Sequence, residues 1–266
     1  VIDLSLGEPD FDTPVHIKEA AKKALDDGYT KYTPVNGLLE LRQAIVNKLA
    51  RENDLHYTVN QIVVSNGAKQ SVYNLCMALL DPGDEVILPA PYWVSYAEIV
   101  KMAGGVPVIA NSSIEQDFKS TPEEIEALIT DRTKFILYSS PCNPSGSVFS
   151  FEELQALALM LQAHEHVLVV SDEIYEHINF TDRHYTIASM EGMKDRTVII
   201  NGMSKGYAMT GWRLGYIAGP DWIADACTKI QGQVTSGARK KKKKAAAVAL
   251  ESDHTPTKEM VKAFHQ

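Results

Sequence analysis

The sequence predicts an α/β fold in which helices cover both faces of a mostly parallel sheet. Short and almost continuous apolar runs alternate along the chain with segments of helical periodicity. Strands buried on both faces lack the strict alternation of half-exposed strands, so these runs favour parallel strands joined by crossover helices. With 266 residues, the chain is long enough for one large core or for two domains.

Helices are expected where apolar residues recur at intervals of three or four. The segment 16–27 has this pattern and ends at Gly28, a common stop signal. A proline and two acids follow Thr121, and Ser150 precedes two glutamates, as in capped helix starts. The expected helices are 16–27, 38–52, 71–80, 91–103, 121–129, 150–164 and, in part, 251–266.

Strands are expected in the short apolar runs between these helices. Their Val, Ile and Leu content, their length of four to six residues and the turn residues beside them are typical of buried strands. The expected strands are 61–65, 85–89, 106–110, 134–139, 167–170 and 197–200.

Polar residues follow three of these strands. Ser204 and Lys205 come after 197–200, Asp172 ends the run that begins at Val167, and Asn143 lies in a turn after 134–139. Because parallel strands end at the same edge of a sheet, these groups are expected to form one site. A surface lysine, a turn-capping aspartate and an ordinary turn asparagine are the alternatives when each residue is taken alone.

Two further segments could hold an anion such as a phosphate. Arg213 follows Lys205 and could bind one through a charge-assisted fork. Gly67, Ala68 and Lys69 join a strand to a helix, where free backbone N–H groups and the positive end of the helix dipole favour anions. Most strand-to-helix joints of this kind bind no ligand, so this pattern supports a phosphate site only in combination with the other residues.

Taken together, these residues resemble the pyridoxal-phosphate aminotransferases of class I, and bacterial aspartate aminotransferases in particular. The match runs in family order from the segment 6–14, Leu-Gly-Glu-Pro-Asp-Phe-Asp-Thr-Pro, to Gly219-Pro220. The resemblance implies the large domain of fold type I, with a seven-stranded type of sheet. It also implies that 1–16 belongs to a small domain, 17–259 to the large cofactor-binding domain, and 260–266 to the start of a largely absent C-terminal small domain.

The resemblance implies a catalytic role for three residues. Lys205 would form the Schiff base with pyridoxal phosphate and, once freed, move a proton at the substrate; burial near other cations would lower its pKa. Asp172 would keep the pyridine nitrogen protonated, which makes the ring an electron sink. Tyr175, together with Asn143, would donate hydrogen bonds to the ring hydroxyl.

The resemblance also assigns the remaining contacts. Trp93 would stack on the cofactor ring, although tryptophans at such positions are often ordinary core residues. Gly7, Trp93 and Asn143 would lie near the substrate, and Tyr32 would reach the phosphate in the neighbouring subunit of a homodimer with shared sites. The phosphate itself would be held by Gly67, Ala68, Lys69, Ser204 and Arg213.

The activity implied is transfer of an amino group between an amino acid, with aspartate as first choice, and a 2-oxo acid such as 2-oxoglutarate, by way of pyridoxamine phosphate. Aromatic, kynurenine, prephenate and alanine transaminases and a carbon–sulfur lyase share these motifs and remain alternatives. So does a non-catalytic ligand-binding domain of the aminotransferase type. A nicotinamide-dependent dehydrogenase is disfavoured because no glycine-rich dinucleotide fingerprint follows the first strand.

Composition and charge narrow the partners further. A net charge of −8 argues against nucleic acid, and no apolar run of about 18 residues predicts a membrane span. The three cysteines, Cys76, Cys142 and Cys227, indicate neither a disulfide framework nor a metal site, which favours a reducing, cytoplasmic location. His164 and His166 lie two residues apart without a third ligand, so no metal is expected.

Two features near the C-terminal end depart from the family pattern. Lysines occupy every position of 240–244, a run that usually marks a solvated face or a disordered tail. The family also grips the substrate α-carboxylate with an arginine in its C-terminal small domain, and no arginine follows Arg239. We therefore expect the chain to be part of a longer aminotransferase.

Overall fold

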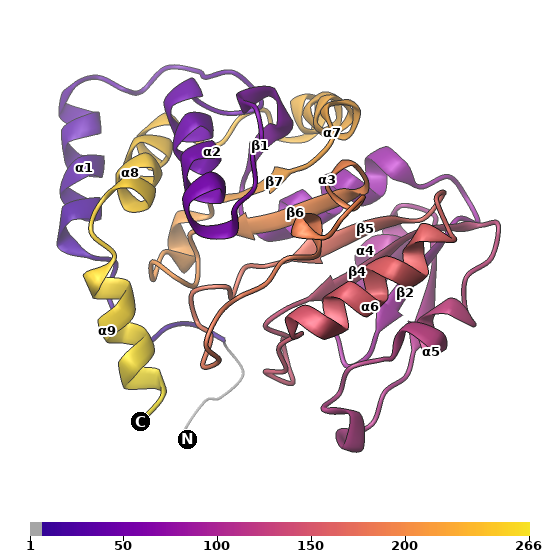
Figure 1. Cartoon of the computed structure of the whole chain (residues 1–266). Helices are drawn as coiled ribbons and strands as arrows, with labels where there is room; N and C mark the ends of the chain where they lie inside the picture. The colour runs from indigo at the N-terminus through magenta and orange to yellow at the C-terminus, as the bar shows by residue number, and fades with distance from the viewer. Residues whose placement is uncertain (1–6) are drawn as a thin grey trace, which may run out of the picture.

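A computed structural model describes residues 7–266, so residues 1–6 of the segment 1–16, which is expected to belong to the small domain, lie outside the described range. Seven strands form one sheet in the order β1-β7-β6-β5-β4-β2-β3, and β7 runs antiparallel to both of its neighbours (Figure 1). The other neighbouring strands are parallel, which confirms the expected fold class. The strands are β1 (Ile62–Ser65), β2 (Glu85–Pro89), β3 (Val106–Ala110), β4 (Thr133–Ser139), β5 (Leu168–Asp172), β6 (Thr197–Gly202) and β7 (Gly215–Ala218).

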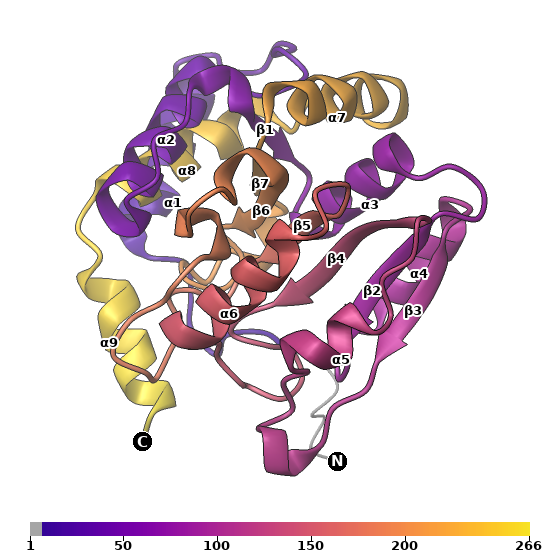
Figure 2. The same ribbon diagram turned by 45° about the vertical axis from the view of Figure 1, so that its right-hand side comes forward.

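Helices cover both faces of this sheet, as the two views show (Figures 1 and 2). Helices α3, α4 and α7 pack on one face in a single apolar cluster that reaches from β1 to β2. On the other face, α2 and α8 cover β1, β6 and β7, while α6 covers β2, β4 and β5. The helices are α1 (Val15–Asp26), α2 (Leu39–Asn53), α3 (Ala68–Leu79), α4 (Ser95–Met102), α5 (Pro122–Glu126), α6 (Phe151–Gln162), α7 (Asp221–Val234), α8 (Lys240–Glu251) and α9 (Thr255–Phe264).

Several boundaries differ from the expected ones, most usefully at α3. This helix begins at Ala68 rather than at Ser71, because Gly67 adopts φ +90° and turns the chain directly from β1 into the helix. Helix α4 begins at Ser95, later than expected, since the preceding residues form a turn that carries Trp93 to the sheet edge. Strand β7 and helix α7 were not located individually from the sequence pattern.

The lysine run is neither a tail nor a fully solvated face. It forms the first turns of α8, which packs against α1 and α2. The Lys243 side chain is completely buried, and its Nζ donates to Thr33 Oγ1 at 2.7 Å. Lys240 and Lys244 lie over the ring of Tyr29, at 4.8 and 4.7 Å from its centroid. Their long alkyl stems therefore contribute to packing, which the charge pattern alone did not predict.

No helix between residues 7 and 266 combines the length and the apolar character needed to cross a membrane.

Candidate active site

A cavity of about 830 Å³ opens at the carboxyl ends of β4, β5 and β6. It brings together ten of the twelve residues expected in the site; Gly67 lies directly behind it, and Tyr32 lies elsewhere on the surface. The lining residues are Gly7, Glu8, Ala68, Lys69, Trp93, Val94, Tyr96, Ser139, Asn143, Asp172, Ile174, Tyr175, Ser204, Lys205, Thr210, Gly211 and Arg213.

One end of the cavity is built to receive an anion. The N-terminus of α3 faces it, and within residues 7–266 no hydrogen-bond acceptor is found for the backbone N–H groups of Ala68 and Lys69. The guanidinium of Arg213 lies against Gly67, where a Cβ atom would approach Arg213 Nη2 to 2.5 Å. Gly67 is therefore needed both for its positive φ and for the space that Arg213 fills.

Lys205 projects into the cavity from the loop that follows β6. Its Nζ donates a hydrogen bond to the backbone carbonyl of Gly7 and lies 5.6 Å from the ring centroid of Tyr175. Burial lowers the pKa of the Lys205 amine; the carboxylate of Glu8 opposes this shift, and Arg213 reinforces it. A lysine with a lowered pKa holds more of its neutral, nucleophilic form near neutral pH.

Asp172 ends β5 at the floor of the cavity and is only 3% exposed. Its Oδ2 accepts a hydrogen bond from Tyr96 Oη at 2.7 Å, and its Oδ1 accepts one from the Ile174 N–H at 3.2 Å. Asp172 therefore caps the turn, which was the alternative role for this residue taken alone. No described residue forms an ion pair with it. Burial raises the pKa of Asp172 to about 6, although the Tyr96 hydrogen bond opposes this shift.

Tyr175, Asn143 and Trp93 complete the walls of the cavity. The pKa of Tyr175 is raised by burial and then by the nearby charge of Asp172. The backbone N–H of Asn143 donates to Ser139 Oγ at 3.4 Å, which ties its turn to the end of β4. The Trp93 ring lies edge-on to Tyr96 at 5.5 Å, with Lys69 Nζ 4.8 Å from the Trp93 ring centroid.

Tyr32 does not line the cavity, and 98% of its surface is exposed. Sequence reasoning in turn did not assign seven residues that line the cavity: Glu8, Val94, Tyr96, Ser139, Ile174, Thr210 and Gly211. Tyr96 follows Trp93 by three residues, a spacing that could have placed both on one side of a helix. Glu8 directly follows Gly7, and its carboxylate accepts a hydrogen bond from the Thr210 hydroxyl.

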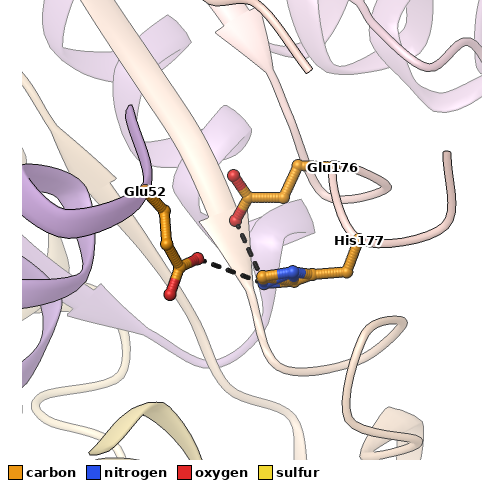
Figure 3. Close-up of side chains that lie close together, drawn as sticks. All are labelled: Glu52, Glu176 and His177. Carbon is orange, nitrogen blue, oxygen red and sulfur yellow. Dashed lines mark ion pairs between the residues drawn. The ribbon is translucent and has the colours of Figure 1, made fainter. Parts of the chain in front are cut away.

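Behind the cavity lies a second group of charged side chains, which we call the support cluster: Lys48, Glu52, Glu176 and His177. Figure 3 shows that the last three point toward one another, with His177 Nε2 at 3.5 Å from Glu176 and 3.7 Å from Glu52. Such a group could in principle hold a metal ion. However, the ammonium of Lys48 already contacts the Glu176 carboxylate, so a cation is supplied by the chain and we assign no metal here.

The sheet order and the strand-end cavity, with its lysine, buried carboxylate and anion-binding end, define an α/β protein whose cavity is suited to an anionic ligand. The family model for aminotransferases of class I and II matches residues 1–266, and the chain belongs to that family.

Individual relatives agree with this membership. The chain is 48% identical over 268 residues to an aspartate/prephenate aminotransferase of Nitrosomonas europaea, covering 100% of this chain and 68% of that protein. It is 51% identical over 251 residues to a bifunctional aspartate aminotransferase and glutamate/aspartate-prephenate aminotransferase of Petunia hybrida, covering 94% of this chain and 52% of that protein. The chain therefore spans between about half and two thirds of these relatives.

Solved structures give the same result. An aspartate aminotransferase from Rhizobium meliloti superposes with a TM-score of 0.98 at 46% identity, over 100% of this chain and 67% of that one. An aromatic aminotransferase from Pyrococcus horikoshii superposes with a TM-score of 0.97 at 43% identity, over 100% of this chain and 72% of that one.

The cofactor that the family implies, pyridoxal phosphate, fits the residues present. The free N–H groups of Ala68 and Lys69, with Arg213, suit its phosphate. A protonated pyridine nitrogen would supply the cation that Asp172 lacks among the described residues. The Lys205 amine lies in the same cavity, where it can reach an aldehyde.

Proposed function

We propose that the protein containing this chain is a pyridoxal-phosphate-dependent aminotransferase that moves the amino group of aspartate to a 2-oxo acid, with 2-oxoglutarate as the first acceptor to test. One observation carries the proposal. A buried carboxylate without a cationic partner, Asp172, lines the same cavity as a lysine whose pKa is lowered, Lys205. Relatives named as aspartate aminotransferases support the choice of donor.

Pyridoxal phosphate supplies an electron sink that makes the Cα–H bond of a bound amino acid acidic. The residues of the chain hold it and move the proton. Lys205 would hold the cofactor through its aldehyde carbon, with loss of water; once the substrate amine takes its place, the freed Lys205 amine would move the proton from the substrate Cα to that same cofactor carbon. Asp172 would keep the pyridine nitrogen protonated, while Arg213 and the α3 amides would hold the phosphate.

Prephenate is a second candidate for the acceptor. Both relatives described above carry prephenate in their names. The two acceptors are compared in assays of the full-length protein.

We also propose the domain plan and assembly that the resemblance implies. Residues 17–259 would form the large domain, with 1–16 and 260–266 belonging to the small one. Tyr32, exposed and outside the cavity, would reach the phosphate in a second subunit of a homodimer. Three free cysteines are in keeping with a reducing, cytoplasmic location.

The test is to add pyridoxal phosphate to the full-length protein, reduce it with borohydride and locate the modified peptide by mass spectrometry. We expect the cofactor on Lys205 and no visible absorption band of bound cofactor in Lys205→Ala. Modification of other lysines at random, with no band in the wild type, would refute the proposal.

Substrate assays then separate the alternatives. Formation of oxaloacetate from aspartate, with 2-oxoglutarate or prephenate as acceptor, identifies the transaminase. Release of pyruvate and a thiol from a cysteine conjugate would identify a carbon–sulfur lyase. Cofactor binding without turnover of any of these substrates would identify a ligand-binding domain.

A further inference from the structure

We propose that the buried ion pair between Lys48 and Glu176 positions Tyr175 and Lys205 for the reaction, so that Glu176 is a positioning residue of the active site. The inference rests on the proposed function, and it concerns side chains that do not line the cavity. The residues that carry it belong to the support cluster (Figure 3).

Glu176 is fixed from two other elements of the fold. Its carboxylate contacts Lys48 Nζ of α2, and the two side chains are only 7% and 1% exposed. Asn201 Nδ2 of β6 donates to Glu176 Oε1 at 2.8 Å, and Asn53 Nδ2 of α2 donates to Oε2 at 3.3 Å. Lys48 Nζ also donates to Asn53 Oδ1 at 2.8 Å, so the donors and acceptors of the pair satisfy one another.

This arrangement holds Tyr175 through the backbone. Tyr175 directly precedes Glu176 in a tight turn, in which the Glu176 N–H donates to Glu173 O at 3.0 Å and the Ile178 N–H donates to Tyr175 O at 2.8 Å. The Tyr175 side chain lines the cavity, whereas the Glu176 side chain points to α2. Anchoring Glu176 therefore sets where the Tyr175 hydroxyl lies relative to the cavity.

The same cluster holds the Lys205 loop. Asn201, which donates to Glu176, lies at the end of β6, four residues before Lys205, and its own Oδ1 accepts from the Gly202 N–H at 2.7 Å. His177 packs directly on Gly206, where a Cβ atom would come within 2.9 Å of the His177 ring. The residue after Lys205 thus has no room to shift toward the cluster.

The pKa of Glu176 indicates that its carboxylate stays charged. Burial is the largest single influence and by itself raises the pKa of Glu176, but Lys48, His177 and His184 together outweigh it, so the pKa falls to about 2. Glu176 therefore stays ionised throughout the pH range in which an aminotransferase would work. The cluster behaves as a rigid support there, and Glu176 itself exchanges no proton.

The test replaces the pair by apolar residues of similar size, Lys48→Met with Glu176→Leu, because buried ion pairs often tolerate this exchange without loss of stability. The control exchanges another buried glutamate and its partner, Glu85→Leu with Arg132→Met, at the amino end of β2. Glu176→Gln serves as a milder second variant, since it keeps the length of the side chain and an acceptor for Lys48.

Two readouts are taken on the full-length protein. The first is kcat and KM with aspartate, for which we expect kcat of the double variant to fall on the order of a hundredfold with little change in KM, as for misplaced catalytic groups. The second needs no cofactor: the pH dependence of Lys205 acylation, followed by mass spectrometry. We expect its midpoint to move upward toward that of an ordinary lysine, because the loop no longer holds Lys205 in its buried position beside Arg213.

The outcomes separate the two proposals. A wild-type protein that binds no pyridoxal phosphate would overturn the proposed function, while the acylation profile would still test the positioning. A double variant with the kcat and acylation midpoint of the Glu85/Arg132 control would overturn the positioning role. An equal fall of kcat in the control would do the same, because it would show a general effect of removing an ion pair that includes a buried glutamate.

Discussion

Asp172 and Glu176 are carboxylates four residues apart on one turn, and both lie almost wholly out of solvent. Asp172 faces the cavity, receives one hydroxyl and one backbone N–H, and has no cationic partner among residues 7–266. Glu176 faces the other way and receives a lysine and two side-chain amides. Their pKa values move in opposite directions, up to about 6 for Asp172 and down to about 2 for Glu176.

This difference distinguishes the two polar regions on either side of the turn. In the cavity, the Asp172 carboxylate and the Lys205 amine have no ion-pair partner among the described residues, and two backbone N–H groups have no hydrogen-bond acceptor there. In the support cluster, the carboxylate and the lysine are satisfied by the chain itself. We infer that the cavity is completed by a ligand and that the cluster keeps its walls in place. The following variants test this difference between the two regions.

The largest expected effect is the fall in kcat of the Lys205→Ala variant. This change removes the amine that moves the proton at the substrate Cα, so kcat should fall by about 10²–10⁴-fold. The folded state should remain as stable as the wild type, because the lost amine is partly buried and makes no ion pair among the described residues. Transamination assays and denaturant unfolding without cofactor measure both quantities, and a large loss of stability would contradict the account.

Unlike Lys205→Ala, Lys48→Met alone should lower the free energy of unfolding. It leaves the Glu176 carboxylate buried without its cation, and breaking a buried pair in this way typically costs about 3–5 kcal/mol. Urea unfolding of the cofactor-free protein measures the loss. Lys22→Met, which removes the exposed Lys22–Glu19 pair, is the control. If Lys48→Met lost less stability than this control, Glu176 would not depend on Lys48 as its partner.

The pH dependence of stability should separate the two carboxylates. The pKa of Asp172 is raised from 3.8 to about 6, so its stabilising contribution is fully present below pH 3.8 and is lost as the pH rises through 6. Relative to Asp172→Asn, the cofactor-free wild type should therefore lose about 3 kcal/mol of unfolding free energy over this interval. Glu176 contributes in the opposite sense, with stability that is lost as the pH falls toward 2.

Unfolding curves of wild type and Asp172→Asn from pH 4 to pH 7 provide the measurement. A constant difference between the two proteins across this range would contradict the raised pKa of Asp172. Added pyridoxal phosphate should reduce the loss in the wild type, since the ring supplies a cation.

Tyr96→Phe should have a smaller effect that acts through Asp172. The Tyr96 hydroxyl stabilises the charged carboxylate, and a hydrogen bond to a charged group contributes about 1.5–3 kcal/mol. Its loss should raise the pKa of Asp172 by about one to two units. Tyr57→Phe is the matched control, because the Tyr57 hydroxyl is buried and has no hydrogen-bond partner among the described residues. The free energy of unfolding of both variants is measured as a function of pH. The same pH dependence in Tyr96→Phe and Tyr57→Phe would contradict the role of Tyr96 in setting the pKa of Asp172.

The smallest effect is expected at the start of α8. Lys241 lies in the first turn, where the helix dipole disfavours a cation, so Lys241→Glu should stabilise the fold by about 0.3–1 kcal/mol at low salt. Added salt should reduce the gain. Thermal unfolding at two salt concentrations tests this, and a destabilised variant would show that the lysine run is needed for the fold.

The sequence predicted the parallel core of the sheet well because buried strands and amphipathic helices leave a clear pattern. The antiparallel β7 was not located, since its four residues, Gly215–Ala218, carry no distinctive alternation and their direction depends on tertiary pairing. The packing of the lysine run was missed for a related reason: burial of Lys243 depends on Thr33, which is far away in the sequence.

The candidate site shows the same division. Lys205, Asp172 and Arg213 could be proposed from motifs, because their chemistry is visible in the residue type and in the strand that each follows. The Tyr96 hydrogen bond and the Lys48–Glu176 pair could not, since each joins residues far apart in the chain through side-chain geometry. The supporting contacts of a site therefore need the structure, even where the reactive groups do not.

The most direct test is a crystal structure of the full-length protein grown with pyridoxal phosphate. The account predicts electron density that is continuous from Lys205 Nζ to the cofactor, the pyridine nitrogen beside Asp172, and the phosphate against the Ala68 and Lys69 amides and Arg213. The Lys48–Glu176 pair should be unchanged. A cofactor bound away from this cavity, or one with its phosphate beside Asp172, would contradict it.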